Sequence, residues 1–254
     1  MPRCSECDGS EMLQTETVNE RITERIAQLD WRRIRAELDE QGYATTGPLL
    51  LPEECADLIS GYGETTNFRS RIVMSRHGFG RGEYQYYGYP LPRMVHALRD
   101  GIYPHLTETA NRWSRELKTG HDFPADHAAY LRLCHEQGQE RPTPLLLQYG
   151  AGDYNCLHQD LYGDLFFPLQ AAFLLSDPGS AFTGGEFVLT EQRPRMQSRV
   201  AVVPLQAGEA VIFAVNHRPQ QGSRGSYRVT MRHGVSPIRS GHRFTLGVIF
   251  HDAR

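Results

Sequence analysis

The sequence feature that most limits the fold of this chain is a series of short apolar runs in its second half. From Pro144 onward, apolar runs alternate with turns rich in glycine, proline, aspartate and serine. Several short strands at close, regular spacing predict an all-β sandwich or barrel for this part of the chain. The runs lie at residues 145–149, 169–175, 185–189, 199–203, 210–215 and 244–250.

The first half of the chain favours helices. Isoleucines and leucines recur at mostly helical spacing within residues 15–41, which predicts one or two amphipathic helices. Prolines at helix-start positions predict further helices at about 52–61 and 91–117, and a short helix is expected near residues 125–135. Residues 66–92 are rich in arginine, glycine and tyrosine and favour strands and loops.

Helices first and strands later predict an α+β fold whose main core is β, with an N-terminal helical layer packed on it. A chain of 254 residues can bury a sizeable core without a disulfide or metal staple. We therefore expect one domain over residues 16–254, with helical support from 16–143 and a β core from 144–254. Residues 1–15 are polar and are expected to be disordered or frayed.

Charge and cysteine content bear on partners and location. The net charge of −3 predicts no strong overall attraction to nucleic acid or to a membrane. The sequence shows neither a signal-peptide core nor an apolar run long enough to span a bilayer. Five scattered cysteines favour a reducing compartment, so the expected location is the cytoplasm. Cys4 and Cys7 have zinc-ligand spacing, but no second pair completes such a site.

Two separate histidine motifs suggest a metal site. His158-Gln159-Asp160 follows a strand-like run, and His233 lies before the last apolar run. On a strand, residues i and i+2 point to the same face, so His158 and Asp160 can reach one ion. Two imidazoles and one carboxylate leave about half of an octahedral site open, which suits a non-haem Fe(II) that binds a cosubstrate and O₂ together. The alternative is a surface histidine beside a solvated aspartate, with His233 in a structural role.

Arg243 opens the almost wholly apolar run that ends at Phe250. A buried arginine is costly unless an anion pairs with it, and its planar cation binds a carboxylate through two parallel hydrogen bonds. Thr245 lies on the same face of this strand and can donate a hydroxyl hydrogen bond to the same anion. These residues predict a carboxylate site. The alternative is an arginine at a strand end that reaches solvent.

Four segments of the second half follow a common pattern. Residues 148–160 end in the HxD motif, residues 183–187 form a Thr-Gly-Gly-Glu-Phe turn, and residues 204–213 place a glycine before a strand. Residues 233–243 read H-x-V-x-P-I-x-x-G-x-R. In content and order, these segments resemble the 2-oxoglutarate/Fe(II)-dependent dioxygenases. The resemblance is greatest to the prolyl 4-hydroxylase-like branch and covers residues 144–252.

This resemblance implies a double-stranded β-helix, or jelly roll, and an oxidoreductase that uses Fe(II), 2-oxoglutarate and O₂. It implies three iron ligands: His158, Asp160 and His233. It also implies three cofactor-binding residues: Arg243, as partner of the distal carboxylate of 2-oxoglutarate, with Thr245 and Tyr149. In such a hydroxylase, decarboxylation to succinate and CO₂ drives oxidation of the substrate. No side chain beyond the metal ligands then acts as a catalytic group.

These motifs do not indicate the substrate or the oligomeric state. A peptidyl residue or a small metabolite is the first expectation. Clustered arginines and the aromatic segment 84–89 keep open the oxidative demethylation of nucleobases, as in the AlkB-type branch, because phosphate contacts and base stacking use those residue types. The net charge disfavours a nucleic-acid partner, and no membrane partner is expected.

Other functional classes remain open at this stage. A non-enzymatic β-sandwich binding protein with a degenerate site predicts that the three ligands do not converge and that Arg243 points to solvent. A zinc hydrolase requires a general base beside a metal-bound water, and Glu186 is the nearest candidate. The polar, glycine-containing stretch 216–232 predicts either a substrate lid or a solvated insertion.

Overall fold

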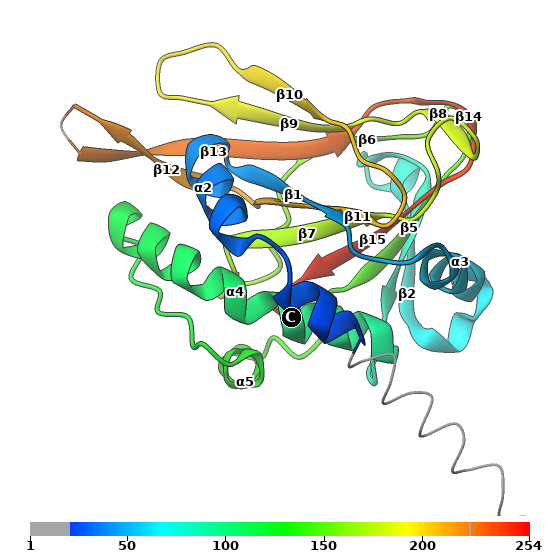
Figure 1. Ribbon diagram of the computed structural model, residues 1–254, viewed down its shortest axis with the longest axis horizontal. Helices are drawn as coiled ribbons and strands as arrows, with labels where there is room; N and C mark the ends of the chain where they lie inside the picture. Colours follow the sequence, from blue (N-terminus) through cyan, green and yellow to red (C-terminus); the bar gives the residue numbers. More distant parts are fainter. Residues whose placement is uncertain (1–20, 224) are drawn as a thin grey trace, which may run out of the picture.

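The computed structural model describes residues 21–223 and 225–254. Cys4, Cys7 and the stretch 1–15 lie outside the described residues. Two β-sheets face each other, and helices cover the outer side of the larger sheet (Figure 1). This arrangement confirms the mainly β jelly roll with a helical layer that the sequence predicts.

The larger sheet has seven strands in the order β1-β11-β7-β15-β5-β4-β2, and every neighbouring pair is antiparallel. In chain order these strands are β1 (Tyr43–Pro48), β2 (Phe68–Val73), β4 (Glu83–Tyr87), β5 (Leu145–Tyr149), β7 (Leu169–Leu174), β11 (Glu209–Ala214) and β15 (Arg243–Ile249). Strand β15, the last of them in the sequence, lies at the centre of the sheet.

The smaller sheet follows the path β10-β9-β13-β6-β3, with β12 paired to β13 outside this path. In chain order its strands are β3 (Gly80–Arg81), β6 (Tyr154–His158), β9 (Phe187–Gln192), β10 (Arg199–Val203), β12 (His217–Gly222) and β13 (Gly225–Val235). Strands β8 (Phe182–Gly184) and β14 (Ile238–Gly241) form a separate two-stranded ribbon. Strand β13 is the longest strand described, because its residues 225–230 pair with β12 and its residues 230–235 pair with β9 and β6.

Alternate residues of the central strands β7 and β11 of the larger sheet divide between two hydrophobic cores. Leu246 and Val248 of β15 belong to the cluster that the helices complete. Phe213 of the larger sheet and Phe187 of the smaller sheet belong to a second cluster between the two sheets, with their ring centroids 5.1 Å apart. The two sheets therefore enclose a core of their own, and part of that enclosed space is the cavity described below.

The helices are α2 (Trp31–Gln41), α3 (Pro52–Ser60), α4 (Arg93–Leu117) and α5 (His127–Glu136), and residues 21–27 are also helical. Asp30 caps α2 by accepting a hydrogen bond from the backbone N–H of Arg33, and Gly42 ends this helix at a φ of 83°. Helices α3, α4 and α5 occupy the positions expected from the sequence. No described helix combines the length and apolar character needed to cross a membrane.

The region expected to give helical support also supplies strands. Strand β1 pairs with β11 at one edge of the larger sheet, and β4 joins β5 on the other side and carries β2. Thr46 of β1 accepts a hydrogen bond from the backbone N–H of Ala210 at 3.0 Å. The N-terminal segment is thus built into the sheet as well as packed against it.

Candidate functional site

A cavity of about 330 Å³ opens between the two sheets. Strands β4, β5 and β15 form one wall, and β6, β9 and β13 form the other. All six residues singled out by the sequence motifs line this cavity: Tyr149, His158, Asp160, His233, Arg243 and Thr245.

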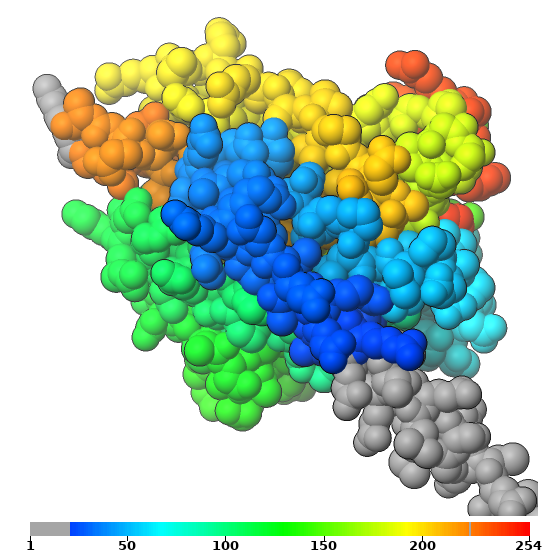
Figure 2. Space-filling model, in the orientation of Figure 1, coloured from blue at the N-terminus to red at the C-terminus, as the bar shows by residue number. Residues whose placement is uncertain are grey.

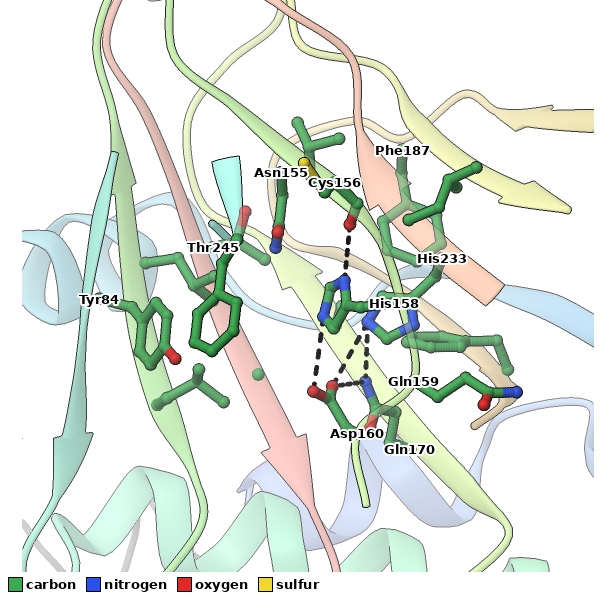
Figure 3. A pocket seen from close by; sticks show the side chains of 18 of the residues that line it. Tyr84, Asn155, Cys156, His158, Gln159, Asp160, Gln170, Phe187, His233 and Thr245 are labelled. Carbon is green, nitrogen blue, oxygen red and sulfur yellow. Dashed lines mark hydrogen bonds and ion pairs between the residues drawn. The ribbon is translucent and has the colours of Figure 1, made fainter. Parts of the chain in front are cut away.

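His158, Asp160 and His233 come together in this cavity. Each offers one ligand atom, and these atoms lie within 4.8 Å of one another. His158 ends β6 and is paired in register with His233 on β13, so strand pairing alone places the two imidazoles side by side, with ring centroids 4.1 Å apart. Asp160 follows β6 by two residues. Figure 3 shows the two rings and the carboxylate pointing toward one another.

Hydrogen bonds orient the two imidazoles. Nδ1 of His158 lies 2.8 Å from the carbonyl oxygen of Cys156, so the Nδ1–H donates to that carbonyl and the lone pair is on Nε2. This Nε2 lies 3.4 Å from Asp160, and Nε2 of His233 lies 3.3 Å from the same carboxylate. Both imidazoles therefore direct a nitrogen toward the carboxylate.

The Asp160 carboxylate is held by two residues that the motifs do not include. The Tyr162 hydroxyl donates to one oxygen at 2.8 Å, and the Gln170 amide donates to the other at 2.8 Å. Burial raises the pKa of Asp160, but the neighbouring His158 and His233 outweigh it and hold this pKa well below its usual range. The carboxylate is therefore ionised at neutral pH.

His233 is almost fully enclosed, and this fixes its charge. Burial, together with the neighbouring His158, lowers the pKa of His233 to about 4, although Asp160 acts in the opposite direction. At neutral pH this imidazole is neutral and keeps a lone pair for a metal. Two imidazoles and one carboxylate with open positions are the donor set of non-haem Fe(II) oxygenases, so these residues fit that metal.

Arg243 is 1% exposed and faces the same cavity from the first position of β15. Its guanidinium donates to the Thr245 hydroxyl and lies 5.7 Å from the ring centroid of Tyr149, its register partner on β5. Among the described residues no carboxylate lies within ion-pair distance of it, and its Nε has no hydrogen-bond partner. Burial lowers the pKa of Arg243 to about 10, an effect that Tyr149 and Glu186 partly offset.

A buried, unpaired guanidinium is destabilising by itself, so this arrangement favours an anionic ligand. Because Thr245 accepts from Arg243, its own hydroxyl hydrogen is free for that anion. Tyr149 is fully buried beside the arginine, and its hydroxyl accepts from Asn155 at 3.3 Å. The three residues form the kind of pocket that a carboxylate requires.

The expectation of a substrate lid in residues 216–232 is wrong. Strands β12 and β13 pair across this stretch, and none of its described residues lines the cavity. The hairpin projects at the side of the molecule, next to the end of α4 (Figure 2), where Ser226 donates to Glu116 at 2.9 Å. Regular strand pairing satisfies its backbone, and part of its polar sequence is structural, because Arg218 is buried and pairs with Glu191 at 2.6 Å.

The alternative functional classes lose their support at this point. The three ligands converge and Arg243 is buried, which contradicts the binding protein with a degenerate site. Glu186 is exposed, hydrogen-bonded through its backbone N–H to Ser236, and does not line the cavity, so it is not placed as a general base for a zinc hydrolase.

Solved structures with this fold include oxygenases. A Pseudomonas putida prolyl-4-hydroxylase is 14% identical with a TM-score of 0.53, over 88% of this chain and 99% of that one. A Trichoplax adhaerens prolyl hydroxylase, solved with a hypoxia inducible factor peptide, is 13% identical with a TM-score of 0.56, over 97% and 94%. The α-ketoglutarate-dependent epimerase SnoN from nogalamycin biosynthesis is 15% identical with a TM-score of 0.52, over 86% and 81%. These likenesses establish the fold of the prolyl 4-hydroxylase-like branch.

The fold, the His–Asp–His cluster and the family match together define the class of protein, an oxygenase that uses Fe(II), 2-oxoglutarate and O₂. The chain belongs to the family described as "Oxygenase, catalysing oxidative methylation of damaged DNA", whose model matches residues 82–253. Two uncharacterised proteins from strains of Mycobacterium tuberculosis, MT2286 and Rv2227, are each 47% identical over 164 residues. The match covers 65% of this chain and 70% of theirs.

Proposed function

We propose that His158, Asp160 and His233 hold the catalytic Fe(II), and that Arg243, Thr245 and Tyr149 bind the distal carboxylate of 2-oxoglutarate. The observation that carries this proposal is one cavity that contains both a three-ligand cluster and a buried cation without an anionic partner. The cluster supplies half of an octahedral site, and the cation supplies the anchor that a dicarboxylate cosubstrate needs.

When bound, the iron, 2-oxoglutarate and O₂ supply the oxidising chemistry, with succinate and CO₂ as co-products. The protein supplies orientation. The Cys156 carbonyl sets the tautomer of His158, and Tyr162 and Gln170 hold the Asp160 carboxylate. Arg243 fixes the cosubstrate at one end of the cavity.

We further propose that the substrate is an alkylated nucleobase. The family description, which refers to damaged DNA, supports this substrate class. Tyr84 and Tyr86 line the cavity with their rings edge to face, 5.3 Å apart, and offer aromatic surface to a planar base.

The rim of the cavity also suits a nucleic acid. Phe79 is 47% exposed at the rim, stacks on His77 with ring centroids 5.3 Å apart, and lies between the exposed Arg76 and Arg81. Its carbonyl accepts from the backbone N–H of Cys156 at 2.9 Å, which fixes this segment beside β6. An exposed aromatic ring with two exposed arginines close to it in the sequence suits base stacking and phosphate contact, although the net charge of the chain is −3.

The reaction balances for an N-methylated base. One O₂ and one 2-oxoglutarate convert the N–CH₃ carbon to N–CH₂OH, with succinate and CO₂ released. The N–CH₂OH group then loses formaldehyde and leaves N–H. Hydroxylation therefore removes the methyl group from the damaged base. A peptidyl residue or small metabolite, the first expectation from the sequence, is supported only by the shared fold, because the prolyl hydroxylase relatives are 13–14% identical.

Anaerobic titration of the Fe(II)-loaded protein with 2-oxoglutarate tests the site assignment. We expect a visible charge-transfer band from the chelated keto acid, and we expect it to be lost in His233→Ala. Single-stranded oligonucleotides with and without 1-methyladenine then test the substrate, with formaldehyde and succinate as equimolar products from the methylated one only.

The two parts of the proposal fail separately. No band from a folded, iron-loaded protein contradicts the ligand assignment. A normal band without formaldehyde, together with succinate release on proline-containing peptides or free amino acids, contradicts the nucleobase and restores the first expectation.

A further inference from the structure

A second cavity of about 250 Å³ lies away from the iron site. It is enclosed by the last turns of α4, by the connection that follows α4, and by the β12–β13 strands, which lie beside this end of α4 in Figure 1. None of its lining residues lines the first cavity. It is therefore a separate site, which the proposed oxygenase reaction does not use.

The floor of this second cavity is aromatic and apolar. Trp113, on α4, is 1% exposed, and its indole N–H donates to Asp39 at 2.8 Å, so the polar edge of the ring is already satisfied. Phe123 and Phe166 provide further aromatic surface from two different segments. Such walls accommodate a flat ring and offer it little hydrogen bonding.

The polar groups of the cavity are basic or neutral. Arg228 of β13 lines it, is exposed, and forms no ion pair within the described part of the chain. Nδ1 of His217, on β12, is buried and has no hydrogen-bond partner there. Within residues 21–223 and 225–254, no aspartate or glutamate lines the cavity. One free cation and one unsatisfied imidazole nitrogen beside an aromatic floor complement an anion attached to a ring.

The walls are held in place without a ligand. Asn111 exchanges two hydrogen bonds with the backbone of Phe123, at 2.9 and 2.7 Å. The Ser114 hydroxyl donates to the carbonyl oxygen of His121 at 2.6 Å. These contacts hold the connection after α4 against the helix, so the cavity walls need little further ordering when a ligand binds. A preformed pocket binds a small ligand with a low entropic cost.

We propose that this second cavity binds a small planar aromatic anion, with its ring against Trp113 and Phe166 and its anionic group toward Arg228 and His217. The site is independent of the nucleobase proposal, because it shares no residue with the iron cavity. It gives the protein a ligand-binding function in addition to its oxygenase activity.

A matched pair of probes tests the proposal. Naphthalene-2-carboxylate and its neutral amide are titrated calorimetrically into the Fe(II)-loaded protein, without O₂ and with saturating 2-oxoglutarate, so that the anion-binding part of the first cavity at Arg243 is occupied. We expect one site per chain and about tenfold tighter binding of the carboxylate than of the amide. Arg228→Gln removes this preference. Arg232→Gln, an exposed arginine four residues along the same strand that does not line the cavity, preserves it.

Four outcomes overturn the proposal. The first is that neither probe binds up to millimolar concentration, and the second is that the two probes bind equally well. The third is that Arg228→Gln still binds the carboxylate more tightly than the amide. Binding that is seen only without 2-oxoglutarate places the probe in the first cavity and also contradicts the proposal. Because Arg228 is exposed, its variant is expected to unfold at the same urea concentration as the parent protein, and this comparison separates loss of the site from loss of the fold.

Discussion

Replacing Arg243 by methionine is predicted to weaken cosubstrate binding while leaving the empty protein at least as stable. Burial lowers the pKa of this guanidinium from 12.5 to about 10. Since one pKa unit corresponds to about 1.36 kcal/mol, the charged form carries a penalty of about 3 kcal/mol in the fold. Methionine fills similar length without a charge, so removal of this penalty offsets the lost hydrogen bond to Thr245.

The effect on 2-oxoglutarate has the opposite sign. A hydrogen bond to a charged group contributes about 1.5–3 kcal/mol, and about 1.4 kcal/mol is a tenfold change in affinity. The dissociation constant of 2-oxoglutarate is therefore expected to rise by roughly 10- to 150-fold in Arg243→Met. Arg243→Lys keeps the charge but loses the planar fork, so an intermediate increase is expected.

Two measurements on the same preparations check this reasoning. Urea unfolding of the metal-free protein gives the stability, and anaerobic titration of the Fe(II)-loaded protein gives the affinity for 2-oxoglutarate. Arg239→Met replaces an exposed arginine on β14, the strand that precedes β15 in the sequence; it is the control and should change neither. Unchanged cosubstrate affinity in Arg243→Met refutes the anchoring role. A loss of more than about 2 kcal/mol in stability indicates a structural arginine instead.

Further predictions concern metal, pH and a glycine. Fe(II) at about 100 times its dissociation constant should stabilise the protein by about 2.7 kcal/mol, and chelation should reverse this in calorimetry; no shift contradicts the metal site. Asp252→Asn should cost about 3–5 kcal/mol at pH 7, because the buried carboxylate pairs with Arg99 at 2.7 Å. Arg99 lowers the pKa of Asp252 against the effect of burial, so this stabilisation is present above pH 4 and is lost as pH falls through the lowered pKa; a difference that persists at pH 2 argues against it. Gly185→Ala, at a φ of 64°, places a Cβ against the Ile238 side chain and 3.0 Å from the Arg243 side chain, so both must shift and 2-oxoglutarate binding should weaken. Gly179→Ala has a similar φ of 87° but open space around it, so it carries the same backbone strain and should leave 2-oxoglutarate binding unchanged.

Part of the fold follows directly from the sequence. The runs at 145–149 and 199–203 coincide with β5 and β10, because each is a compact apolar segment bounded by turn residues. Strand β13 is missed although its signal is present. Val229, Met231 and His233 are buried in alternation with exposed or half-buried polar residues, which is the period of a strand. The arginines in this stretch conceal the alternation.

Strand β1 has no comparable signal. Its sequence, Tyr-Ala-Thr-Thr-Gly-Pro, contains little apolar surface and two residues that weaken strands. It is a strand because β11 offers an open edge and Thr46 bonds across to Ala210. Such pairing depends on the assembled sheet and cannot be read from local composition. We propose that the N-terminal region and the β core form a single cooperative unit.

The residues of the site also fall into two groups, those that the sequence predicts and those that only the folded structure reveals. The histidines, Asp160 and Arg243 are found from the sequence because their chemistry and order match a family pattern. Tyr162 and Gln170 are not, because their role depends on where the Asp160 carboxylate lies after folding. Gln170 left one signal, a polar residue within the fully buried strand β7.

The central position of β15 has a consequence for the nascent chain. The two halves of the larger sheet, β1-β11-β7 and β5-β4-β2, are joined by strand pairing only through residues 243–249, which are inserted between them. During synthesis, every other strand of this sheet leaves the ribosome before the one that joins them. Until then, β7 and β5 each present an open, apolar edge, so the unfinished chain passes through a period of exposure in which pairing with other chains competes with closure.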